Sequence, residues 1–206
     1  DISHNIELTY LKCSINPLNK LDISNNIKLE TLHSWSNQLN NLDVTKNIEL
    51  RSLICTYNQL TNLDLSNNIK LEELYCYQNQ LTNLDLSKNI GLILVNCSDN
   101  YLSNLDVNKN VELKELYCSN NLLNNLNLNT SISLLDCSRN QLTNLDVSKN
   151  IKLILVNCSD NYLSNLDVNK NVELKELYCS NNQLNNLNLN TSINLLDCSR
   201  NLLNNL

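Results

Sequence analysis

Nine cysteines recur at nearly constant spacing in the 206-residue chain, and cysteine has the widest chemistry of any residue type in it. The nine are Cys13, Cys55, Cys76, Cys97, Cys118, Cys137, Cys158, Cys179 and Cys198. The steps between them are 21 or 19 residues once Ser34 is counted at the one gap. Disulfides, zinc ligands and buried thiols are the three uses that such a column could serve.

The equal spacing favours buried thiols. Neighbouring repeats would bring the cysteine Cα atoms within bridging distance, but side chains stacked in register point the same way, so the disulfide dihedral angle is hard to reach. The chain has no Cys-x-x-Cys spacing and no converging histidine, which argues against zinc. In an extended strand the side chain of His33 points to the opposite side from that of Ser34, so His33 cannot join the cysteine column. We therefore expect free, inward-facing cysteines, no metal site and no cofactor.

An acidic column accompanies the cysteines, in segments that read Leu-Asp-Leu-Ser or a close variant. Its members are Asp22, Asp43, Asp64, Asp85, Asp106, Asp146 and Asp167, with Asn127 and Asn188 at the equivalent positions of the two 19-residue units. Stacked carboxylates repel, and calcium could relieve this because it favours carboxylate and carbonyl oxygens. The glycine-rich nonapeptide loops of calcium-binding β-rolls are missing, however. The interpretation that we favour is that each aspartate accepts hydrogen bonds from amides of its own turn.

No group of residues indicates catalysis, and the charge pattern argues against nucleic acid. The histidines are His4 and His33 alone, and no single repeat combines a nucleophile, a base and an orienting group. The net charge is −6, and the 15 basic residues are scattered singly. No apolar run approaches the ~18 residues of a membrane span, and residues 1–10 lack the features of a signal peptide.

All these columns arise from one repeat that runs through the chain. Leu occurs 46 times and Asn 45 times, whereas Gly and Pro occur once each. One unit, residues 71–91, follows the pattern LxxLxCxxNxL and then xxLDLSxNxx. In Leu74-Tyr75-Cys76 and again in Leu84-Asp85-Leu86, two apolar residues flank a polar or amphipathic one, as in a strand with one buried side. Each unit therefore predicts two short strands, whose leucines become buried only when units stack.

This pattern resembles the leucine-rich-repeat family and, more narrowly, its bacterial class of nested 21-residue repeats called IRREKO, found in internalin-like and BspA-like regions. The resemblance implies one solenoid over residues 1–206, with about ten units, parallel β-sheets joined by turns, and little or no α-helix. Asn is expected to make the turns in place of Gly, because it tolerates left-handed backbone and because its amide can bond the local backbone in Asx-type turns. Its two columns, represented by Asn79 and Asn89, are expected to be buried and to pair along the stack.

A duplication is visible in the second half of the chain. Residues 90–145 and 151–206 match at 51 of 56 positions, which indicates that a three-unit block was copied. The third unit of each block is two residues shorter, and pinched turns are expected at residues 129–132 and 190–193. Neither end has the polar cap that a solenoid needs, so we expect the parent protein to be longer than this segment.

The outward positions around the first strand vary most between units, and the resemblance implies that this strand lies on the concave, ligand-binding face. A contiguous amphipathic patch is predicted there, made by His33, Trp35, Ile54, Tyr57, Tyr75 and Tyr77. Trp and Tyr are enriched at binding hot spots, yet aromatic residues on neighbouring strands also stabilise a sheet by packing together. Both interpretations of the patch stay open on the sequence.

Three functions are compatible with this pattern. The first is a non-enzymatic, protein-binding module of an extracellular or cell-surface bacterial protein, similar to adhesins of the internalin type, as the resemblance implies. The second is a surface that binds carbohydrate or cell wall, because Trp, Tyr and Asn on a flat sheet also suit sugar rings and hydroxyls. The third is a spacer without any ligand. We favour a protein partner, with a glycan as the alternative.

Overall fold

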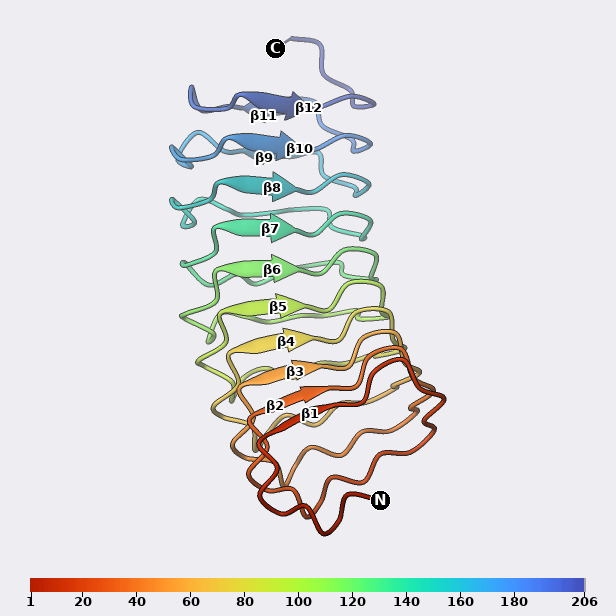
Figure 1. Ribbon diagram of the computed structural model, residues 1–206. Helices are drawn as coiled ribbons and strands as arrows, with labels where there is room; N and C mark the ends of the chain where they lie inside the picture. The colour runs from red at the N-terminus through yellow and green to blue at the C-terminus, as the bar shows by residue number, and fades with distance from the viewer. Residues whose placement is uncertain (206) are drawn as a thin grey trace.

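The computed structural model describes residues 1–205 and is a stack of coils in which each repeat contributes one strand to a parallel sheet (Figure 1). The ten strands of this sheet are β1 (Tyr10–Lys12), β2 (Thr31–His33), β3 (Ser52–Ile54), β4 (Glu73–Tyr75), β5 (Leu94–Asn96), β6 (Glu115–Tyr117), β7 (Leu134–Asp136), β8 (Leu155–Asn157), β10 (Glu176–Tyr178) and β12 (Leu195–Asp197). Residues 1–205 contain no α-helix, and hence no helix able to span a membrane. The predicted solenoid of parallel strands and turns is confirmed.

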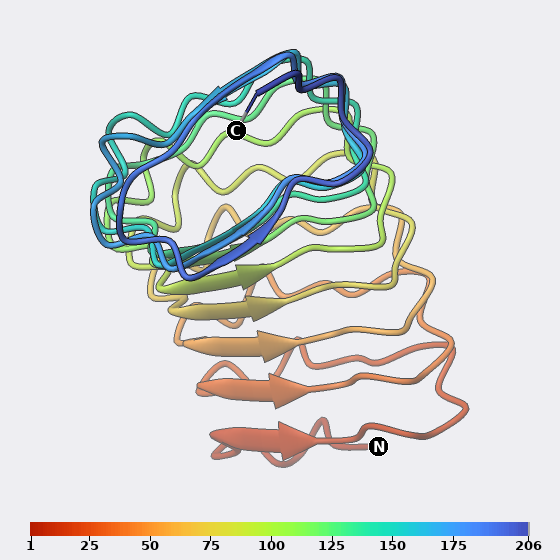
Figure 2. The same cartoon turned by 90° about the horizontal axis from the view of Figure 1, so that it is seen from above.

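Equivalent residues of successive repeats lie side by side, because every strand pairs with the next in the same register. Leu32 pairs with Leu53, and Leu53 pairs with Leu74. These leucines face inward and are fully buried, as is the residue after each interior strand, which is Ser34 after β2 and a cysteine after the others. Seen along the stack, the coils lie over one another with the sheet along one side (Figure 2). The core is therefore one continuous cluster built from apolar columns that run along the stack.

The second predicted strand of each unit forms in only a small part of the chain. Strands β9 (Asn165–Asp167) and β11 (Asn186–Asn188) pair with each other, and Asp106 forms an isolated bridge with Asn127. Within residues 1–205, the other Leu-Asp-Leu segments pass through this side of the coil without strand pairing. Two parallel sheets are thus present, but the second has two strands where the first has ten.

The asparagine columns do not supply the left-handed backbone that the sequence suggested. Ten residues other than Gly have φ between 52° and 57°, and they are Ile15, Ser36, Tyr57, Gln78, Asp99, Asn120, Arg139, Asp160, Asn181 and Arg200. Each lies two residues after the cysteine position, directly before the first asparagine column. None of these ten residues belongs to a predicted asparagine column, so the expectation of left-handed backbone in the columns is wrong. The expectation that Asn amides bond the local backbone is confirmed, because Asn79 donates to the carbonyls of Cys76 and Tyr77 in its own turn.

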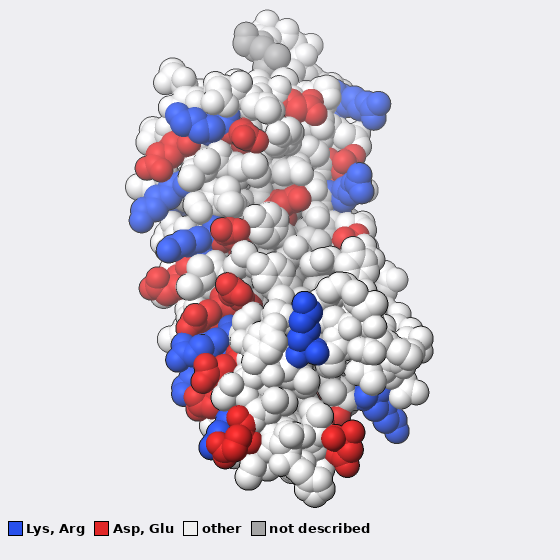
Figure 3. Space-filling model, in the orientation of Figure 1, with Lys and Arg blue, Asp and Glu red and all other residues white. Residues whose placement is uncertain are grey.

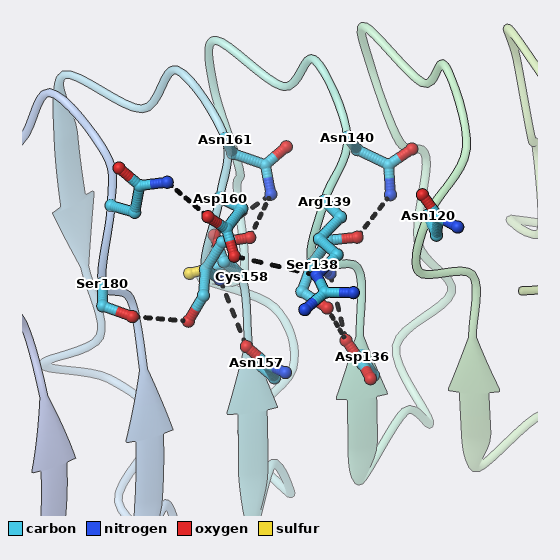
Figure 4. A network of polar contacts seen from close by, with 12 residues as sticks. Asn120, Asp136, Ser138, Arg139, Asn140, Asn157, Cys158, Asp160, Asn161 and Ser180 are labelled. Atoms are coloured by element: carbon cyan, nitrogen blue, oxygen red, sulfur yellow. Dashed lines mark hydrogen bonds and ion pairs between the residues drawn. The ribbon is translucent and has the colours of Figure 1, made fainter. Parts of the chain in front are cut away.

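The first asparagine column binds backbone groups of two repeats at once. The Nδ2 of Asn79 donates to the carbonyls of Cys76 and Cys55, at 3.1 and 3.0 Å, and its Oδ1 accepts from the N–H of Leu60 at 3.0 Å. Figure 4 shows the bonds within one repeat for two members of this column, from Asn161 to the carbonyl of Cys158 and from Asn140 to that of Ser138. The prediction of buried columns is confirmed for this column, but the amides bond to backbone rather than to one another.

The second asparagine column is less completely satisfied. The Nδ2 of Asn68 donates to the carbonyls of Val44 and Asn47, at 3.0 and 2.9 Å, both in the preceding repeat. Its Oδ1 is buried and has no hydrogen-bond donor among residues 1–205, and the same holds at Asn47 and Asn89. The two columns therefore differ in how much of the backbone they hold.

The shortened turns of the duplicated blocks are closed by asparagine. The Oδ1 of Asn129 accepts hydrogen bonds from the N–H groups of Ser131 and Ile132, at 2.6 and 3.2 Å. Asn190 accepts from Ser192 in the same way, at 2.6 Å. The tight turns expected in these two units are present.

Candidate functional site

The predicted patch lies on the outer face of the ten-stranded sheet and occupies two adjacent rows. The strand-end row contains His33, Ile54 and Tyr75, which are direct neighbours in the sheet register. Two residues later in the chain comes the row of Trp35 and Tyr77, on the same side of the inward-facing cysteine position. The residue between them in that row, Thr56, is buried, so that row is not continuous.

Tyr57 lies one position further on, at a left-handed backbone site, and connects with the second row. Its ring packs edge to face on Tyr77, with the centroids 5.3 Å apart. Tyr57 is 50% exposed, whereas the other five predicted residues are half-buried. The structure thus places all six predicted residues on neighbouring coils.

One aromatic neighbour was not predicted from the sequence. The Tyr10 ring packs edge to face on His33, with the centroids 5.4 Å apart, and its hydroxyl lies 3.4 Å from His33 Nδ1. Tyr10 stands two residues before the strand-end row, on the same side of β1, so the alternation along a strand could have identified it. The patch therefore begins at β1.

Burial and nearby charge both act on the titratable groups of this face. Burial lowers the pKa of His33, and Lys12 lowers it further while Glu73 opposes them. Burial raises the pKa of Tyr75, with contributions from Glu73 and Glu115. His33 is consequently neutral and Tyr75 protonated at neutral pH. Charged side chains are densest along the side of the strand starts, a second set lines the opposite side, and few lie in the centre (Figure 3).

The cysteine column offers no reactive thiol in the interior of the stack. All nine cysteines are free, and the seven from Cys55 to Cys179 are buried. Burial raises the pKa of the Cys55 and Cys97 thiols to about 12, so the nucleophilic thiolate is scarce at neutral pH. Ser34 occupies the column with a buried hydroxyl that has no hydrogen-bond partner among residues 1–205. The expected buried thiols are confirmed.

The acidic column makes the local turns that were predicted. The carboxylate of Asp22 accepts the N–H of Ser24 at 3.0 Å, and that of Asp43 accepts both the N–H and the hydroxyl of Thr45, at 2.9 and 2.6 Å. These hydrogen bonds lower the pKa of both carboxyls. The part of the chain that the structure describes has no group of three His, Cys, Asp or Glu side chains placed to hold a metal ion.

In the duplicated block, away from the patch, polar side chains form a row along the left-handed positions. Asp160 lies between Arg139, at 4.0 Å, and the amide of Asn181 (Figure 4). Ser180 and Ser159 are joined by their hydroxyls at 3.2 Å. At these positions the duplicated block thus carries a polar, mixed-charge surface, whereas the first repeats carry aromatic rings.

Stacked coils joined by one continuous parallel sheet define a parallel β-solenoid. The functional domain of InlJ from Listeria monocytogenes, which includes a cysteine ladder, is 36% identical to this chain with a TM-score of 0.89. That alignment covers 96% of this chain and 47% of the other. No protein-family model matches the sequence, and none of the curated proteins matches it.

Two further solved structures have the same architecture. A leucine-rich-repeat protein of Leptospira interrogans is 22% identical, with a TM-score of 0.89, over 98% of this chain and 57% of that one. A chain of the LRIM1/APL1C complex is 27% identical, with a TM-score of 0.83, over 97% and 41%. The chain described here is a leucine-rich-repeat protein whose repeats are about 21 residues long. It spans about half the length of the InlJ domain that it matches.

Proposed function

We propose that this chain is a non-enzymatic protein-binding module of a bacterial surface or secreted protein, and that the sheet face over β1–β4 is its contact surface. The proposal extends the likeness to InlJ, an internalin of Listeria monocytogenes, to the role of this chain. The LRIM1/APL1C complex adds that a similar solenoid is found in an assembly with another protein.

Tyr57 carries the proposal. The equivalent left-handed positions of the other nine repeats hold Ile, Ser, Gln, Asp, Asn or Arg, so the turn itself does not require an aromatic side chain. This position instead holds an aromatic ring that stays 50% exposed and is braced by Tyr77. A ring held rigidly at the surface, beside Trp35 and Tyr75, is the kind of anchor that binding surfaces use.

The first test measures binding to arrays of host proteins and of glycans. A Trp35→Ala, Tyr75→Ala double variant should bind a protein ligand on the order of 100-fold more weakly than the unchanged chain, because each residue is expected to act as a hot spot. The control is a Tyr101→Ala, Tyr162→Ala variant, which removes two tyrosines that are 55% and 53% exposed outside the patch. Undiminished binding by the first variant would show that the patch is wrong.

Two other outcomes would replace the proposal. Binding to glycans alone, lost in the double variant, would identify a carbohydrate-binding surface. Absence of any ligand on either array would favour a spacer. A Tyr57→Gly variant separates binding from folding, because Gly adopts the left-handed backbone more easily while the ring is removed. Its thermal midpoint should stay unchanged while its binding weakens.

A further inference from the structure

Strands β4, β5 and β6 form a slot beside the aromatic patch, with large side chains on its two sides and smaller ones between. The register places Tyr75, Asn96 and Tyr117 in one row across the three strands. Because adjacent strands lie ~4.8 Å apart, the two tyrosines stand about 10 Å from each other. The gap above Asn96 is wide enough for one unbranched side chain between the rings.

A second row completes the slot with two carboxylates. Glu73, Leu94 and Glu115 are neighbours in the same register, two residues before the first row. Residues two apart in a strand lie on the same side of the sheet, so both rows face outward. Leu94 is half-buried and forms an apolar floor between the glutamates.

The carboxylates of the slot have no cation of their own. Glu73 accepts a hydrogen bond from the Ser52 hydroxyl at 3.2 Å, and Glu115 accepts one from the Tyr117 hydroxyl at 3.1 Å. Neither forms an ion pair with a Lys or Arg among residues 1–205. Glu72, next to Glu73 in the chain, is paired with Arg51 at 2.5 Å. Glu176, at the start of β10, forms no ion pair among residues 1–205 either, so the slot is distinguished by two such carboxylates that lie only two strands apart.

The charge of Glu115 acts on both walls. Burial is the main reason that the pKa values of Tyr75 and Tyr117 are raised, and Glu115 adds to the increase at each ring. A neutral or acidic occupant would displace water from these carboxylates without giving them a compensating interaction. This desolvation costs free energy. A cation would interact favourably with them and with the faces of the two rings.

We propose that this slot binds the side chain of a Lys or Arg residue presented by the partner protein. The aliphatic part of the side chain would lie over Leu94 between the tyrosine rings, and its charged end would reach Glu73 or Glu115. The inference rests on the proposed function, because it assigns the chemistry of one side chain of the protein partner. It also predicts that binding weakens as salt concentration rises.

The duplicated block supplies a matched control. Tyr178 donates to Glu176 at 3.2 Å, as Tyr117 does to Glu115. The strands on either side of Glu176 carry Leu155 and Leu195 in the same row, so this pair has no second Tyr-Glu wall. Glu176→Gln thus removes an equivalent carboxylate outside the slot.

The test titrates the whole chain with N-acetyl-lysine methylamide and N-acetyl-arginine methylamide, followed by amide NMR shifts, with the uncharged norleucine analogue as the reference probe. Both cationic probes should shift the amides of Leu94, Asn96 and Tyr117, and norleucine should not. Glu115→Gln should weaken the cationic probes about fivefold, the upper range for an exposed ion pair, while Glu176→Gln leaves them unchanged. Equal shifts with norleucine, or no effect of Glu115→Gln, would overturn the proposal.

The result is separable from that of the proposed function. Glu115→Gln keeps the shape of the side chain and an acceptor for the Tyr117 hydroxyl, and an unchanged thermal midpoint would confirm folding. Cationic probes that bind the slot in a chain without any protein ligand would support the site and reject the protein-binding role. A protein ligand whose affinity is insensitive to Glu115→Gln would support that role and reject the slot.

Discussion

The two sides of each repeat carry similar alternating patterns and fold differently. The cysteine side forms a sheet of ten strands, while the aspartate side forms one pair, β9 with β11, and a single bridge. At the ends of the cysteine-side strands, no two carboxylates are neighbours. The aspartates at these positions, Asp136 and Asp197, each lie beside uncharged residues. The aspartate side stacks Asp on Asp through most of its length.

The exceptions indicate that charge repulsion decides this difference. Asp106 pairs with Asn127, and Asp167 pairs with Asn188, so strand pairing on this side forms where Asn replaces one carboxylate. Asn188 donates its amide to Asp167 at 3.3 Å, a contact that two carboxylates cannot make. Asp146 and Asn127 are a third Asp-Asn pair at equivalent positions of successive units, but their segments do not pair as strands. The shortened turn lies between these two residues in the chain. Like charges directly opposite one another oppose strand pairing, and one amide removes that opposition.

The largest expected difference between the two sides lies in their asparagine columns. Asn79→Ala would remove its bonds to the carbonyls of Cys55 and Cys76 and leave the buried N–H of Leu60 without a partner, at a cost of about 3 kcal/mol in the free energy of unfolding. The two carbonyls keep one bond each, from Asn58 and Asn100. Asn68→Ala should cost about half as much, because it removes fewer bonds together with a buried, unpaired oxygen. Urea unfolding of both variants measures the ratio, and equal losses would contradict it.

Ser34 interrupts the buried cysteine column, and a substitution can restore the column. Ser34→Cys replaces a buried hydroxyl that lacks a partner by the thiol used at the same position of other repeats. The free energy of unfolding should rise by about 1 kcal/mol. Cys97→Ser is the reverse change and should lower it by a similar amount. A loss of stability in Ser34→Cys would mean that this hydroxyl is satisfied by a group other than the residues described.

The repulsion account can be tested where pairing now exists. Asn188→Asp should break the bond from the N–H of Val168 to the carbonyl of residue 188, now 2.8 Å long, and make exchange of that N–H with solvent about threefold faster. The N–H of Cys158, which bonds to Tyr178 in the ten-stranded sheet, should exchange at an unchanged rate. Hydrogen exchange followed by NMR measures both amides, and unchanged protection at Val168 would reject the explanation.

The smallest expected effect is a loss of stability in acid, arising mainly on the aspartate side. Hydrogen bonds from their turns lower the pKa values of Asp22, Asp43, Asp64, Asp85 and Asp146. The unfolded chain therefore takes up protons at higher pH than the folded chain does. The stability that these carboxylates add is complete above about pH 5 and is lost as the pH falls through their lowered values. Thermal midpoints between pH 7 and pH 3 measure the decline, which should be gradual.

Much of the fold follows from spacing alone. A fixed period of 21 residues puts equivalent residues in columns, and the alternation around Leu74 and Cys76 assigns them to the inside. The same reasoning identified the aspartate turns and the buried thiols, since each depends on a few residues close in sequence. It also placed His33, Trp35 and Tyr75 on neighbouring coils, because register and period coincide in a stack.

Other features depended on contacts between coils. Which residue takes the left-handed backbone was decided by the hydrogen bonds of the Asn that follows it, which reach into the preceding coil, so even Tyr57 adopts it. Whether an aspartate segment becomes a strand depended on the charge of the next coil. The unpaired carboxylates of Glu73 and Glu115 emerged only when their neighbours in space were known. The sequence by itself determined the repeating path of the chain, whereas packing between coils decided which segments pair as strands, which residues are left-handed and which carboxylates stay unpaired.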